Sequence, residues 1–207
     1  MDYRRSYQSA AVSFADLVSR LPADRWDGPG LGDWTLRDLV GHTVSSALRQ
    51  VPAALASPVE TVAVETAEAY WSLARTVPPD IYATFTAAST RDARETGRDL
   101  GDDPASAVSE LVGRATQALA GAGDDDVIAT AAGGMRLRDW LPTRTFELVV
   151  HGQDVADAAG VAYVLAPEVL AEAAAQAARV AAAGGDGALL LRALTGRAAL
   201  PEKFSII

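Results

Sequence analysis

The sequence predicts an all-α protein built on a four-helix bundle, and two observations support this prediction. Apolar residues recur at the three- and four-residue spacing of an amphipathic helix over four stretches, each long enough for a bundle. Clusters of Pro, Gly and Asp separate these stretches, and such clusters end helices and form loops. The predicted bundle helices are residues 2–20, 35–52, 104–120 and 138–160.

The composition suits one folded domain with no affinity for nucleic acid. The chain has 207 residues, of which 49% are hydrophobic, enough for a sizeable core. We expect a single domain, with a bundle core at about 1–160 and a helical appendage at about 161–207. The net charge of −9 and the pI of about 4.7 lack the basic footprint of a nucleic-acid-binding protein.

The chain contains no cysteine, which excludes disulfides, thiolate zinc sites and a cysteine nucleophile. Its N-terminus has no apolar run typical of a signal peptide. No stretch approaches the length of uninterrupted apolar residues that a transmembrane helix needs. We therefore expect a cytoplasmic protein without a membrane partner.

The first bundle helix has one apolar face, formed by Tyr3, Tyr7, Ala10, Ala11, Phe14, Leu17 and Val18. The second should begin at Thr35, because Thr35 as N-cap and Asp38 three residues later resemble a capping box. Pro52 lies where that helix should end. The third should begin with Asp103 as N-cap and Pro104 as its first residue.

The region between the second and third bundle helices is harder to interpret. Residues 59–77 look helical and stop at Pro78, whereas 81–90 are compatible with a helix or a strand. Residues 91–104 are rich in charge, and we expect a solvated connector there. Residues 127–137 predict a loop or a short pair of strands.

After the fourth bundle helix, two further helices are expected at 167–183 and 186–196. The fourth helix itself looks buried on nearly all sides, since Phe146, Leu148, Val149 and Val150 surround it.

One narrow stripe of this apolar helix is polar. At about 100° per residue, Glu147, His151 and Asp154 fall on one line. Burying these groups is costly unless they are paired or bound, and a divalent metal accepts both imidazole and carboxylate ligands. His42, from the second helix, could complete a His/Glu/His site whose open position is typical of catalytic zinc.

Other interpretations of the same residues stay open. Glu147 and His151 could form a surface pair or a buried hydrogen bond without metal, and His42 could be an ordinary core histidine. Asp154 is expected either to orient His151 or to cap the helix end.

The bulky and basic residues near these motifs have their own simpler interpretation. Trp34 and Trp140 are expected to pack in the core. Arg49, Arg138 and Arg144 are expected to be surface charges, although Arg49 or Arg144 could instead face a pocket and hold a substrate carboxylate.

Three segments of the sequence resemble one family. GLGDWTLRDLVGH, ending at His42, and RTFELVVHGQDVADAAG, containing Glu147 and His151, are similar to the second- and fourth-helix motifs of the mycothiol-dependent maleylpyruvate isomerase N-terminal metal-binding domain. LLLRALTGR near the C-terminus is similar to the ending of many relatives. The family belongs to the DinB/YfiT-like superfamily, so the resemblance implies a DinB-like four-helix bundle with additional C-terminal helices.

The resemblance also implies a site and its chemistry. The family's metal ligands fall on His42, Glu147 and His151, with zinc the expected ion and nickel another that relatives carry. A low-molecular-weight thiol is the implied cosubstrate. The full isomerase has a separate α/β domain after its bundle, and the 47 residues from 161 to 207 are too few for it. Because of this departure, the resemblance does not by itself carry maleylpyruvate isomerisation over to this chain.

These observations lead to a functional hypothesis with two alternatives. We expect a divalent-metal-binding, mycothiol-type S-transferase or isomerase whose partners are a small-molecule thiol and a small electrophile. The alternatives are a non-catalytic, regulatory metal-binding module and a metal-dependent hydrolase that uses water at the open position. The sequence leaves a homodimer open.

Overall fold

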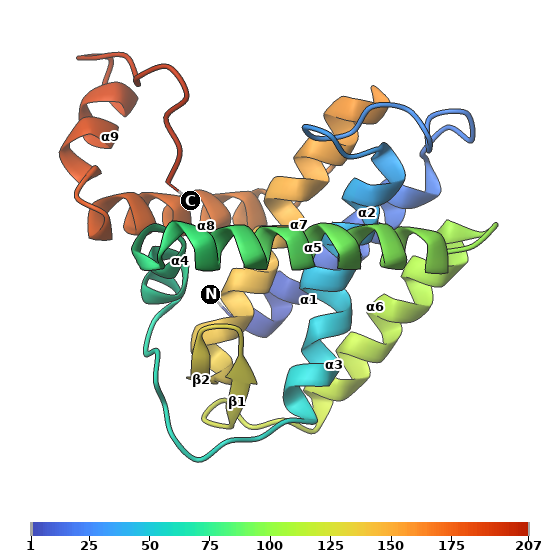
Figure 1. Ribbon diagram of the computed structural model, residues 1–207, viewed down its shortest axis with the longest axis horizontal. Helices are drawn as coiled ribbons and strands as arrows, with labels where there is room; N and C mark the ends of the chain where they lie inside the picture. The colour runs from blue at the N-terminus through green and yellow to red at the C-terminus, as the bar shows by residue number, and fades with distance from the viewer. Residues whose placement is uncertain (1, 207) are drawn as a thin grey trace.

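The computed structural model describes residues 2–206, apart from the side chain of Ala74, and it is mostly helical (Figure 1). The four predicted bundle stretches are all helical, which confirms the all-α, DinB-like fold. They are α1 (Tyr3–Ser19), α2 (Leu36–Val44) continued by the π-helical segment η1 (Ser45–Arg49) and α3 (Gln50–Leu55), α6 (Pro104–Ala120) and α7 (Leu137–Ala159).

The bundle forms around α7, whose apolar surface faces in several directions. Helix α1 packs against α6 and α7, while α2 and η1 pack against α7, and η1 and α3 pack against α6. The largest fully buried side chains include Tyr7, Phe14, Leu17, Leu39, Leu48, Trp140 and Leu141. Trp140 is therefore a packing residue, as predicted. Burial of this apolar surface is the main stabilising term of the fold.

Local signals in the sequence set the helix starts. Thr35 and Asp38 form the predicted capping box, in which the Asp38 amide donates to Thr35 Oγ1 at 3.1 Å and the Thr35 amide to Asp38 Oδ2 at 3.2 Å. Asp103 caps α6 by accepting a hydrogen bond from the Ser106 amide at 3.1 Å. Each cap satisfies a backbone donor that the first turn of a helix leaves without a partner.

The predicted connector at 91–104 is wrong, because most of it is helical. Helix α5 (Pro79–Asp99) continues through it and crosses α2 at very short range. A Cβ atom on Gly41 would lie 2.2 Å from the carbonyl oxygen of Ala93 and 2.5 Å from the amide nitrogen of Gly97. Two glycines thus let the backbones approach, while charged residues of α5 such as Arg91, Arg94 and Glu95 are exposed to solvent.

The predicted helix over 59–77 begins later than expected. Only α4 (Ala67–Thr76) is helical, with Thr66 as its N-cap. The residues before it follow the hairpin of β1 (Val127–Thr130) and β2 (Gly133–Arg136), since the Ala63 amide donates to the Gly134 carbonyl at 2.8 Å. The hairpin itself is antiparallel, so the strand pair was the correct alternative for 127–137.

Two helices follow the bundle, α8 (Pro167–Ala183) and α9 (Gly187–Leu194), close to their predicted positions. Helix α8 packs against α1, α4 and α7, whereas α9 contacts α8 and stands away from the bundle (Figure 1). None of the helices in the described part of the chain is long and apolar enough to cross a membrane.

Candidate metal centre and adjoining cavity

The two histidines of the chain lie side by side, one on α2 and one on α7. The ring centroids of His42 and His151 are 4.8 Å apart. Glu147 lies between them, with its Oε2 atom 3.7 Å from His42 Nε2 and 3.3 Å from His151 Nε2. One ligand atom from each residue lies within 4.8 Å of the others. The helical spacing places only Glu147 and His151 together. The packing of α2 on α7 adds His42 to complete the group.

Each imidazole is held by its other ring nitrogen. His151 Nδ1 lies 3.0 Å from Asp154 Oδ2, and His42 Nδ1 lies 3.3 Å from Ser89 Oγ. Both Nε2 atoms are thereby directed at Glu147. Such outer partners fix ring orientation in metal sites. Trp34 adds a ring contact with His42, 4.9 Å between centroids, so this tryptophan packs against the candidate site.

The environment separates the pKa values of these three groups. Burial lowers the pKa of His42 to about 4. Burial would also lower the pKa of His151, but hydrogen bonds to Asp154 and Glu147 outweigh it and raise that pKa to about 9. Burial would raise the pKa of Glu147, yet the hydrogen bond with His151 and the charge of Arg144 hold it at about 2. Without a metal, a His151–Glu147 ion pair beside a neutral His42 results at pH 7.

A cavity of about 760 Å³ opens onto His42 and Glu147. Residues of α2, η1 and α7 form its polar end, and residues of α4 and α5 form an apolar wall. Its volume lies within the range of about 300 to 1,000 Å³ that is usual for small-molecule sites. The candidate metal group therefore adjoins a space large enough for an organic substrate.

The family model of the mycothiol maleylpyruvate isomerase N-terminal domain matches residues 7–156, well over half of the chain. The chain belongs to this family. The match includes His42, Glu147 and His151, and the family is a metal-binding one. No curated protein and no solved structure matches the chain significantly.

In this family member, Arg144 is a buried residue and not the surface charge that was expected, since it is 1% exposed. Its Nη1 donates to the Ser46 carbonyl at 2.8 Å and to Gln50 Oε1 at 3.0 Å, and its Nη2 to the Tyr70 hydroxyl at 3.0 Å. Nη2 also lies 4.0 Å from Glu147 Oε1. Arg144 thus lines the cavity, but its N–H groups donate hydrogen bonds to other groups of the protein.

The other two arginines that the sequence analysis considered lie outside the cavity lining. Arg49 is paired with Asp99 at 3.2 Å and is not part of the cavity lining. Arg138 is a surface charge, as expected, and is paired with Asp125.

The π-helical segment η1 contributes a site residue to which the sequence had assigned no role. Ser46 Oγ donates to Glu147 Oε2 at 3.1 Å, and the Tyr7 hydroxyl donates to the Ala47 carbonyl at 2.8 Å. Short π-helical stretches often occur at functional sites. The available sequence signal was the spacing of Ser46 four residues after His42, which places both on one face of a helix.

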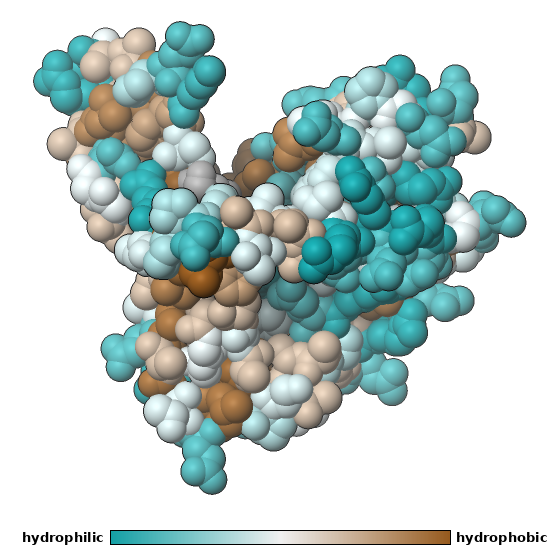
Figure 2. Space-filling model, in the orientation of Figure 1, coloured by the Kyte–Doolittle hydropathy of each residue, from teal (hydrophilic) through white to brown (hydrophobic). Residues whose placement is uncertain are grey.

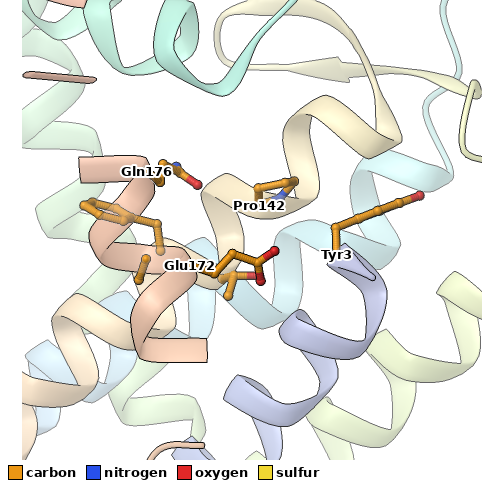
Figure 3. Close-up of a pocket in the computed structure, with 7 residues that line it drawn as sticks. Tyr3, Pro142, Glu172 and Gln176 are labelled. Carbon is orange, nitrogen blue, oxygen red and sulfur yellow. The ribbon is translucent and has the colours of Figure 1, made fainter. Parts of the chain in front are cut away.

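A second, much smaller pocket lies on the other side of α7, where Glu172 and Gln176 of α8 approach Pro142 and Tyr3 (Figure 3). Its volume of about 10 Å³ holds about one water molecule. With its amide oriented to satisfy both neighbours, Gln176 donates to the Pro142 carbonyl at 3.2 Å and accepts from Trp71 Nε1 at 2.9 Å. This pocket is a packing feature between α7 and α8, not a substrate site.

Proposed function

We propose that the protein is a metal- and thiol-dependent transferase or isomerase that acts on a small electrophile. His42, Glu147 and His151 would hold one divalent ion, with zinc favoured and nickel the alternative. One observation supports this proposal above the others. Three ligand atoms lie within 4.8 Å of one another, and two of their residues, His42 and Glu147, line a cavity of about 760 Å³.

The residues present fit such an ion. Two imidazole nitrogens and one carboxylate oxygen are ligands that suit zinc and nickel, and three protein ligands leave a position open. When bound, the metal would lower the pKa of a coordinated thiol and so favour the thiolate at neutral pH.

The chain's own residues hold this donor set in place. Asp154 and Ser89 orient the imidazoles, and Ser46 donates to the carboxylate of Glu147. Each ligand therefore keeps its orientation without the ion, which reduces the cost of binding one. The cavity gives a thiol and an electrophile access to His42 and Glu147 from the side of α4 and α5.

The proposal is tested by removing metal with a chelator, reloading with zinc or nickel, and assaying conjugation of mycothiol to a bromobimane. We expect metal-dependent conjugation that His151→Ala abolishes and Glu110→Ala, an exposed change on α6, leaves intact. Hydrolysis of a reactive ester without thiol would support the hydrolase instead, and metal binding without either activity would support the non-catalytic module. Failure of the wild type to bind either ion tighter than about millimolar would reject the site.

A further inference from the structure

The charged residues that line the large cavity all lie at one end. They are Glu147 and Arg144 of α7 and Asp92 of α5, and Asp92 accepts a hydrogen bond from Ser45. Apart from the candidate ligand His42, the remaining lining residues are apolar or carry uncharged polar side chains. The lining therefore holds two carboxylates against one guanidinium.

That guanidinium offers little to a ligand. Arg144 donates to Thr143, Ser46, Gln50 and Tyr70, and its remaining side faces Glu147. The neighbouring arginines are paired outside the lining, Arg49 with Asp99 and Arg75 with Asp186. Among the described residues that line the cavity, no cation is therefore free to bind a substrate anion.

The opposite wall is apolar and partly exposed. Trp71, Leu73 and Val77 of the α4 region face the cavity together with Ile81, Tyr82 and Phe85 of α5. Ile81, Tyr82 and Phe85 are 43%, 47% and 54% exposed. Figure 2 shows apolar residues gathered near the N-terminal end of α5, whereas hydrophilic residues dominate its C-terminal half. A ligand that covers this wall would remove apolar surface from water, which is favourable.

We propose that the body of the substrate is an apolar or aromatic small molecule without a negative charge, seated against α4 and the first half of α5. Its reactive end would face His42 and Glu147. This inference rests on the proposed function and specifies its substrate class. The charge of the lining and the apolar wall both favour such a substrate, since an anion would face Asp92 without a free cationic side chain in the lining to compensate it.

The test compares two fluorescent probes on one aromatic scaffold in the full chain, treated with chelator and without thiol. They are neutral N-phenyl-1-naphthylamine and its sulfonated, anionic counterpart 8-anilinonaphthalene-1-sulfonate. We expect the neutral probe to bind at least about tenfold more tightly. Asp92→Asn should improve binding of the anionic probe about threefold or more. The affinity for the neutral probe should stay within about twofold of the wild-type value.

Two alanine variants locate the binding. Phe85→Ala should weaken binding of the neutral probe about fivefold or more, because the substitution removes an aromatic contact. Leu191→Ala, which removes an exposed leucine on α9 outside the cavity, should leave it unchanged. Equal binding of both probes, or neutral binding sensitive to Leu191→Ala and not to Phe85→Ala, would overturn the proposal. Because this assay needs neither metal nor thiol, its failure is distinguishable from failure of the proposed transferase activity.

Discussion

The guanidinium of Arg144 donates a 2.8 Å hydrogen bond to the carbonyl oxygen of Ser46, 98 residues earlier in the chain. The side chain of the same serine donates to Glu147 Oε2 at 3.1 Å. Helix α7 and the segment η1 are therefore joined twice, beside the candidate metal ligand. A π-helical stretch departs from the regular α-helical hydrogen bonding, and here a side chain of another helix supports it.

Replacing Arg144 by Met should lower the free energy of unfolding by about 2 to 4 kcal/mol, because several buried acceptors lose their donor at once. Urea denaturation measures this change. Arg138→Met removes an exposed ion pair with Asp125 and should change stability by less than about 0.5 kcal/mol. A loss of less than about 1 kcal/mol for Arg144→Met would show that these bonds contribute little.

Replacing Ser46 by Ala should weaken metal binding about tenfold, since outer partners of metal ligands contribute on this scale. Isothermal titration with zinc after chelator treatment measures the affinity. Ser19→Ala, an exposed change near the end of α1, is the matched control. Wild-type affinity in Ser46→Ala would mean that the hydrogen bond to Glu147 does not support the ligand.

Zinc or nickel should raise the melting temperature in a concentration-dependent way, because an ion that binds only the folded form stabilises it by mass action. At a free metal concentration of about 100 times Kd the gain is about 2.7 kcal/mol. His151→Ala should remove most of the response in a thermal scan. An unchanged melting temperature after chelation of fully loaded wild type would contradict a bound ion.

Metal binding at pH 7 should release about one proton, because metal ligands must be deprotonated. That proton comes from His151, whose pKa is raised to about 9, while Glu147, with a pKa of about 2, and His42, with a pKa of about 4, have already lost theirs. Titration calorimetry in buffers of different ionisation enthalpy measures the number of protons released when the metal binds.

The same pKa values give the direction of the pH dependence. Protonated His151 stabilises the metal-free fold fully below its unfolded value of 6.5, and this contribution is lost as pH rises through about 9. Metal affinity should therefore rise between pH 7 and 9 by up to about tenfold per unit. Asp154→Asn removes a group that raises the pKa of His151, so it should reduce the proton release. An affinity independent of pH over this range would contradict the ion pair.

Gly41→Ala should destabilise the protein by about 1 to 3 kcal/mol, because the new methyl group would clash with the backbone of α5 at Ala93 and Gly97. Chemical denaturation tests it against Gly113→Ala on α6, where a Cβ atom meets nothing within 4 Å. That control should stabilise the protein by up to about 1 kcal/mol, since alanine favours a helix more than glycine does. If both variants change stability equally, the close crossing of α2 and α5 is not tightly packed.

The sequence by itself determined the elements that depend on short-range signals. Apolar periodicity located the bundle helices, and the capping residues Thr35 and Asp103 located two of their starts. The four-residue spacing of Glu147 and His151 placed both on one face of α7, since helical geometry alone sets that relation.

The tertiary structure decided what depends on contacts between distant segments. The charged stretch after residue 90 looked like a connector, because its charges are local, whereas the glycine contact that packs it on α2 involves residues over 50 positions apart. The burial of Arg144 could not be predicted either, since its acceptors come from η1, α3 and α4. His42 meets Glu147 only when α2 packs on α7, and the cavity beside them exists only because α4 and α5 form its other wall.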